Sequence, residues 1–339
     1  MNDELVTLLL QRVKEAGAIG RLVEKLKAIK AEQNLPNDFR LTGIKTEQAI
    51  EAARRAVSES WLPEHALAKF VDEVEENGAQ HIFLFDLTDE GRRRLTANRL
   101  GAVFQGVPGH PTVAMYTETP GKKRTFFENR TDALTVKQIF VGSYWERDDD
   151  RSYDREDERA TVMVRQHRRA VNLLRVLPEQ QQVEIRIDRV RGRMDNTLAL
   201  EVLGSFLEDL GDDFDLEVDV TPVEIWRALP RIAADRTEVY LNKDDAEDPS
   251  AKISFHNLRA RDKGTDVRDH PKYQMRGRDV VRTGMNPYWI VPDEENKIYS
   301  NLTVLEAPRL GRCGKIYLSA ELRPTTVQHV LDRIRHFAR

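Results

Sequence analysis

The stretch Val183-Glu184-Ile185-Arg186-Ile187-Asp188-Arg189-Val190 alternates apolar and polar residues without interruption. Because successive side chains of a β-strand point to opposite faces of a sheet, this spacing predicts a half-buried strand with Arg186 on its polar face. It is the clearest strand signal in the chain, and it predicts a sheet with one solvated face.

Further strands are predicted on both sides of this stretch. His81–Leu87 is a short and mostly apolar run, which is typical of a buried strand. Residues 147–159 carry charges of both signs and almost no apolar residue, so they are predicted to form an exposed loop. The remaining predicted strands are Thr112–Tyr116, residues 134–144, Thr161–Val164, Phe214–Val220, Ile298–Leu305, Lys315–Leu322 and segments near Val239, Ile253 and Ile290.

Helical spacing dominates the first 80 residues of the chain. Apolar side chains recur every three or four positions over Leu5–Ala16 and Leu22–Ile29, again after Thr46, and from Pro63 to the stop signal Asn77-Gly78. The later predicted helices cover Asn196–Leu210, a short segment after Pro222 and the stretch that follows Thr325 or Thr326.

These elements predict an α+β fold, in which an N-terminal helical bundle precedes mixed or antiparallel sheet domains with a few packed helices. The chain has 339 residues, and domains of roughly 100–200 residues suggest two or three of them. We expect a helical module over residues 1–80, an α+β sheet domain over residues 81–195, and a second α+β sheet domain with the C-terminal helix over residues 196–339.

Composition favours a soluble protein of a reducing compartment. Hydrophobic residues make up 40% of the chain and charged residues 32%. The single cysteine, Cys313, can form neither an internal disulfide nor a zinc site alone. Residues 1–4 lack the basic start of a secretory signal, and no apolar run approaches the roughly 20 residues that span a bilayer. We therefore predict a cytoplasmic protein with no membrane partner.

Arginine greatly outnumbers lysine, because the 53 basic residues comprise 38 arginines and 15 lysines. The guanidinium group suits bidentate contact with phosphate, although codon bias in a GC-rich genome produces the same excess. The net charge of −4 points to no particular partner, but three basic segments stand out. The residues predicted to contact nucleic acid are Arg165, Arg168 and Arg169 in the first segment, Arg186, Arg189, Arg191 and Arg193 in the second, and Arg259, Arg261, Lys263, Arg268, Lys272, Arg276, Arg278 and Arg282 in the third.

The third segment, Leu258–Thr283, is the densest and is called the basic segment below. It holds few large apolar residues, and Gly264 and Gly277 predict a long loop between strands. A basic loop that contains an aromatic residue, here Tyr273, suits contact with a phosphate backbone. Interleaved aspartates lower its positive charge density, so a solvated or partner-facing loop is the alternative.

Carboxylates suggest a second function class. Asp215, Glu217 and Asp219 would lie on one face of the predicted Phe214–Val220 strand, about 7 Å apart. Some nucleases hold a divalent metal between carboxylates on neighbouring strands. The chain has no lysine two positions after Glu217, so the usual Glu-x-Lys pair is incomplete. An exposed strand face is the simpler interpretation.

No motif of a known catalytic or cofactor site is recognisable. The glycines match neither a phosphate-binding loop nor a dinucleotide-binding turn, and the eight histidines lack metal-binding spacing. Cys313 lies next to Arg312 and near Lys315, whose charges favour a lower thiol pKa, but no sequence signature pairs it with a base. We expect no cofactor and no bound metal.

The order of the elements resembles the centromere protein N family. A helical module precedes the extended stretch Leu134-Thr135-Val136-Lys137-Gln138-Ile139-Phe140-Val141-Gly142-Ser143-Tyr144-Trp145, and a charged insert leads to Ala160–Val164. The resemblance covers about residues 1–190 and rests on arrangement rather than on a specific motif. The arginine-rich composition and everything after residue 190 depart from the family. It implies a non-enzymatic protein that joins a helical domain to twisted sheets and binds nucleosomal DNA together with a partner subunit.

These observations predict a non-catalytic nucleic-acid-binding or adaptor subunit of a larger complex. The helical module would bind a protein partner, while strand faces and the basic segment would contact phosphate. A divergent metal-dependent nuclease and a purely protein-binding scaffold are the alternatives. A helicase or ATPase encoded beside this chain would favour a genome-maintenance or anti-phage complex.

Overall fold

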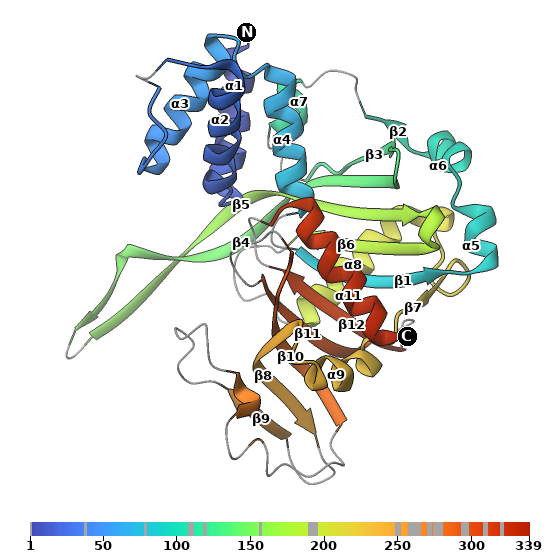
Figure 1. Ribbon diagram of the computed structural model, residues 1–339. Helices are drawn as coiled ribbons and strands as arrows, with labels where there is room; N and C mark the ends of the chain where they lie inside the picture. Colours follow the sequence, from blue (N-terminus) through green and yellow to red (C-terminus); the bar gives the residue numbers. More distant parts are fainter. Residues whose placement is uncertain are drawn as a thin grey trace.

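The protein is an α+β structure, as predicted, with N-terminal helices followed by a large and mostly antiparallel sheet (Figure 1). The structure is a computed structural model. The model describes residues 2–36, 39–77, 80–107, 112–117, 121–155, 158–188, 196–247, 252–256, 266–269, 273, 281–292, 298–307, 311–318 and 322–339.

The helical module contains four helices at the predicted positions: α1 (Asp3–Glu15), α2 (Ile19–Gln33), α3 (Thr46–Ser58) and α4 (Glu64–Asn77). Their apolar stripes form one buried core. The short helix α7 (Val113–Tyr116) joins this core through Met115 and Tyr116. The strand predicted over Thr112–Tyr116 is therefore wrong, because burial of these side chains against the bundle favours a helical turn.

The strands form one continuous sheet. Its order is β2-β3-β4-β5-β6-β1-β12-β11-β10-β8-β9, and β7 pairs with β1 beside this path. Among the strand pairs of the described residues, only β2–β3 is parallel. The strands are β1 (Gln80–Leu87), β2 (Gln105–Gly106), β3 (Arg124–Asn129), β4 (Leu134–Arg155), β5 (Glu158–Leu177), β6 (Gln182–Asp188), β7 (Val220–Pro222), β8 (Val239–Glu247), β9 (Lys252–His256), β10 (Val281–Trp289), β11 (Ile298–Ala307) and β12 (Gly311–Leu318).

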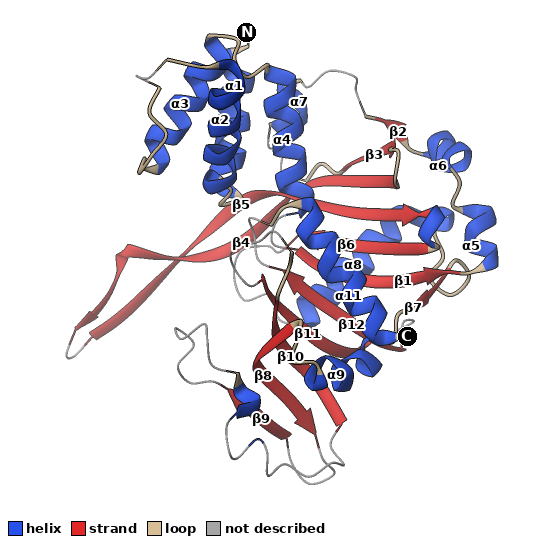
Figure 2. Ribbon diagram, viewed as in Figure 1, coloured by secondary structure: helices blue, strands red, loops and turns tan. Residues whose placement is uncertain are grey.

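Strand β1 lies between β6 and β12, so strands from residues 81–195 and 196–339 meet in the same sheet (Figure 2). Its side chains alternate between two hydrophobic cores. Phe83 and Phe85 belong to the core on one face, and Ile82 and Leu84 belong to the core on the other. Both faces of the sheet are therefore covered in its middle.

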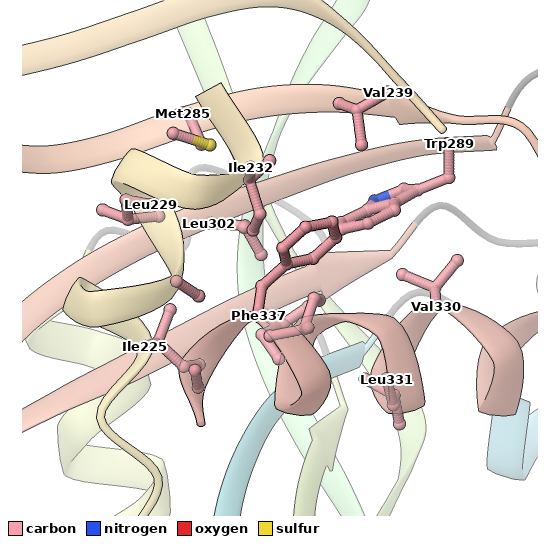
Figure 3. Close-up of a cluster of buried hydrophobic side chains, with 14 of the residues drawn as sticks. Ile225, Leu229, Ile232, Val239, Met285, Trp289, Leu302, Val330, Leu331 and Phe337 are labelled. Carbon is pink, nitrogen blue, oxygen red and sulfur yellow. The ribbon is translucent and has the colours of Figure 1, made fainter. Parts of the chain in front are cut away.

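Different helices cover the two faces. α8 (Asn196–Leu210) packs into the core of Phe83 and Phe85, while α9 (Ile225–Ala234) and α11 (Pro324–Ala338) pack into the other. In that second core Phe337 of α11 lies against Trp289 of β10, with ring centroids 6.3 Å apart (Figure 3). The indole nitrogen of Trp289 donates to the Ser300 hydroxyl at 2.8 Å. The small helices α5 (Asp89–Arg94) and α6 (Ala97–Val103) connect β1 to β2.

Strand β6 is more deeply buried than its alternating pattern predicts. Every residue of Gln182–Asp188 is buried, including Glu184 and Arg186. The prediction of a half-buried strand is wrong because the C-terminal end of α4 covers the polar face, where Arg186 donates to the Glu76 carbonyl at 3.0 Å.

Two other predicted segments fold differently. Residues 147–159, predicted as a loop, lie largely in the paired strands β4 and β5. Phe214–Val220, predicted as a strand, is mostly a turn that reaches β7 only at Val220. Carboxylates cause this turn: Asp215 accepts from the Glu217 amide at 2.8 Å, and Asp219 accepts from the Asp215 amide at 2.7 Å. Side chains that bind nearby backbone amides in this way compete with strand pairing.

Candidate functional site

A cluster of buried charges joins the helical module to the sheet, and it contains two of the predicted nucleic-acid contacts. Helix α4 supplies Glu75 and Glu76. The Arg169 guanidinium on β5 binds Glu75 with Nε–Oε1 at 2.7 Å, and Lys137 on β4 lies 3.3 Å from Glu76. We call this set, together with Asp72, Arg130, Glu184 and Arg186, the junction cluster.

Burial raises the pKa of Asp72 against the opposing effect of Lys137, whereas the pKa values of Glu75 and Glu76 in the junction cluster are lowered. Burial alone would raise the pKa of Glu76, but the neighbouring Lys137 and Arg130 outweigh it and lower that pKa to about 2. Burial likewise opposes ionisation of Glu75, and Arg169 reverses this and lowers its pKa. Glu75 and Glu76 therefore form ion pairs rather than acids or bases poised near neutral pH.

Arg186 belongs to the same cluster from its place on β6. Its guanidinium binds the Glu184 carboxylate at 2.7 Å and the Asn77 side chain at 3.0 Å, and the residue is 1% exposed. Arg169 is 5% exposed. Neither side chain can reach a phosphate backbone in this fold, because both are enclosed between α4 and the sheet.

A cavity of about 810 Å³ opens beside the junction cluster. It lies among α4, the connection from β3 to β4 and the start of α11, and Arg130, Arg175, Glu76 and Glu128 are among its lining residues. Arg130 pairs with Glu76 at 2.6 Å, and Arg175 pairs with buried Glu184 at 2.9 Å. These acidic and basic lining groups are thus engaged with each other in ion pairs.

The basic segment is anchored to the folded body where the structure describes it. Arg268 is 3% exposed; its guanidinium binds the Asp266 carboxylate at 2.8 Å and the Ala233 carbonyl at 3.1 Å. The Tyr273 hydroxyl donates to Asp244 at 2.8 Å, and Arg282 donates to the same carboxylate at 3.1 Å. Arg268 is thus a structural residue, and Tyr273 is engaged with Asp244 rather than presented for stacking.

The remaining predicted contacts divide into two groups. Arg165 is exposed on β5, and Arg168 lies on the same strand. The others lie outside the described residues: Arg189, Arg191, Arg193, Arg259, Arg261, Lys263, Lys272, Arg276 and Arg278.

The described residues around Asp219 do not have the geometry that a nuclease site requires. Asp219 is fully buried and pairs with Arg94 at 3.1 Å, whereas Glu217 is exposed in the turn. The two carboxylates do not share a strand face. No group of three or more His, Cys, Asp or Glu side chains in the described part of the chain is arranged to hold a metal ion.

Cys313 is a core residue rather than a nucleophile. It is 2% exposed among the apolar side chains of the α8 face, and burial raises its pKa to about 11. The positive neighbours in the sequence do not lower this pKa, because the thiol points into the core. The expectation that neighbouring positive charge lowers the thiol pKa is therefore wrong.

No family model matches this chain, and no curated protein matches it. Among solved structures, the crystal structure of DynU16, a protein of the dynemicin biosynthetic locus, aligns with 8% sequence identity over 76% of this chain and 94% of that chain, at a TM-score of 0.17. A likeness this weak carries no argument about fold or function. No helix within the described ranges is long and apolar enough to cross a membrane.

Proposed function

We propose that this chain is a non-catalytic subunit that binds nucleic acid through phosphate contacts made by the basic segment. The observation that carries the proposal is the charge that remains once the described ion pairs are subtracted. Arg268 and Asp266 neutralise each other, Arg282 pairs with Asp244, and Asp269 pairs with Arg236. The rest of the segment, which lies outside the described residues, has six basic residues and two aspartates, Asp262 and Asp279, in its sequence.

Three described residues anchor the basic segment to the folded body. Arg268, Tyr273 and Arg282 bind groups of α9 and β8 near the β9 edge of the sheet. The six other basic residues of the segment are within nine positions of an anchor in the sequence. Tethering basic groups to a rigid body favours phosphate binding because less conformational entropy is lost on association.

The test is binding to duplex DNA across a series of salt concentrations, without divalent metal. The double variant Arg276→Ala/Arg278→Ala should bind more weakly, and its log–log salt slope should fall by about two units, since each lost phosphate contact removes about 0.9. The control Arg92→Ala/Arg93→Ala removes two exposed arginines of α5 that pair with Asp89 and Glu90. An unchanged salt slope in the Arg276→Ala/Arg278→Ala variant would contradict the proposal. An equal loss of DNA affinity in this variant and in the control would also contradict it.

A protein-binding adaptor is the second candidate, and a different observation favours it. The hairpin of β4 and β5 continues well beyond the strands that flank it. This feature does not depend on the basic segment.

A further inference from the structure

The β4–β5 hairpin forms a free-standing arm. β4 pairs with β3 only as far as Ile139, and β5 pairs with β6 only from Leu173 onward. Between these limits β4 and β5 pair with each other out to Arg155 and Glu158, with an irregularity between Asp148 and Tyr153. We call residues 141–155 and 158–168 the arm; Figure 1 shows it projecting away from the rest of the molecule. At a rise of roughly 3.3 Å per residue, residues 158–168 of β5 make it about 36 Å long.

The described part of the arm has no buried core. None of its described side chains is buried. Met163 is 46% exposed. An isolated two-stranded hairpin is at best marginally stable in water. A long arm of this kind therefore gains stability when a second surface covers it.

The charge of the arm indicates which kind of partner surface would cover it. The end of the arm, residues 146–159, carries eight carboxylates and four arginines, a net charge of −4. The whole chain has 57 acidic and 53 basic residues, so the remainder contains 49 of each. The arm end thus carries the entire net charge of the protein. The negative charge of the arm end repels the phosphates of a nucleic acid. The same charge attracts a positively charged protein surface.

The middle of the arm offers an apolar contact beside this charge. Thr161, Met163 and Arg165 alternate along β5, and all three are exposed. Met is enriched in protein–protein interfaces, where its flexible side chain fits irregular surfaces. The arm therefore combines a central apolar residue with an acidic end.

We propose that the arm is a docking element for a protein partner with a lysine- or arginine-rich surface that also presents an apolar residue. The acidic end binds the basic groups, and Met163 packs on the apolar residue. This surface is separate from the basic segment, so it does not depend on nucleic-acid binding. A subunit with both surfaces would join a basic protein to a nucleic acid.

The experiment uses the full chain and a labelled synthetic peptide of alternating lysine and serine with one central leucine. Fluorescence anisotropy at about 0.15 M salt measures the affinity. The arm variant Asp148→Asn/Asp149→Asn/Asp150→Asn/Asp154→Asn should bind about tenfold more weakly. The control Glu4→Gln/Glu32→Gln/Glu59→Gln/Glu208→Gln removes the same charge from exposed residues of the helical module and α8 and should bind as the wild type does.

Two further measurements locate the contact. Met163→Ser keeps the charge and should still weaken binding a few-fold. Amide hydrogen exchange should slow within residues 141–168 when the peptide is added, because an arm without a core exchanges readily when free. An equal loss in the control variant, or protection that falls only outside the arm, would overturn the proposal.

Other occupants of the arm would also be recognised. Slower exchange of the arm on addition of duplex DNA would assign it to nucleic acid and overturn the proposal. Slower exchange that rises with protein concentration alone would assign it to a second copy of this chain, with the same consequence. Failure of the DNA-binding test on Arg276 and Arg278 leaves this inference intact, since the two sets of variants share no residue.

Discussion

Arg169, Arg186 and Arg268 each place a guanidinium group inside the protein, and each binds a carboxylate there. A buried charge without a partner is costly, so such arginines are held by their pairs. A cluster of arginines in a sequence therefore contains both residues that can bind ligands and residues that form ion pairs inside the fold. Only the position of the partner carboxylate in the structure distinguishes the two kinds.

The pair formed by Arg186 and Glu184 gives the residue-scale prediction. Arg186→Met should lower the free energy of unfolding by roughly 3–5 kcal/mol, because it leaves buried Glu184 with less compensation. Adding Glu184→Leu to that variant should recover a large part of the loss, since no unpaired charge remains. Urea denaturation measures both values. A loss below about 1 kcal/mol for Arg186→Met would mean that Arg175, which also contacts Glu184, suffices alone.

Helix α4 is the element that attaches the helical module to the sheet, and it does so mainly through charge. Glu75 and Glu76 bind residues of β5 and β4, and Arg130 beside β4 also binds Glu76. An attachment built from carboxylates depends on pH. The pKa of Glu76 falls from 4.5 to about 2 on folding, so its stabilising contribution is complete above about pH 4.5 and is lost as the pH falls toward 2.

Glu76→Gln tests this dependence at the element scale. At about pH 7 the variant should be less stable than the wild type by roughly 3 kcal/mol, and the difference should shrink as the pH falls below 4.5. Denaturation curves at several pH values measure it. Glu73→Gln, on the same helix, removes a half-exposed carboxylate 3.8 Å from Arg21, so it should change stability little at any pH. A constant difference for Glu76→Gln would contradict the assigned pKa.

The whole molecule is organised around β1, which contributes to both hydrophobic cores and pairs with strands from both halves of the chain. Loss of either core therefore exposes one face of the same strand. The arm stands outside this arrangement, because no core residue comes from its described part.

Removing the arm should thus leave the fold intact. Trp145 and Arg165 face each other across the two strands, so Asn-Gly can replace residues 146–164 as a two-residue turn. The shortened chain should melt within about 3 °C of the wild type, since a ΔΔG near zero shifts Tm little. It should also lose the net charge of −4, so its isoelectric point should rise above 6.1. Scanning calorimetry and isoelectric focusing measure the two effects, and a drop of more than about 10 °C would show that the arm supports the sheet.

Local patterns in the sequence determined the helical module, the later helices α8, α9 and α11, and the α+β class, because the spacing of apolar residues reports which face of an element is buried. Tertiary structure decided the rest. Arg186 is buried by the end of α4, more than 100 positions earlier in the chain, and Asp215 and Asp219 turn the chain where alternation predicts a strand. The arm could not be predicted either, because its charged sequence is compatible with a loop and only the pairing of β4 with β5 makes it a two-stranded ribbon. The spacing of apolar residues indicates which face of a single element is buried. Ion pairs and strand pairs join residues of different elements, and the sequence does not show which residues come together.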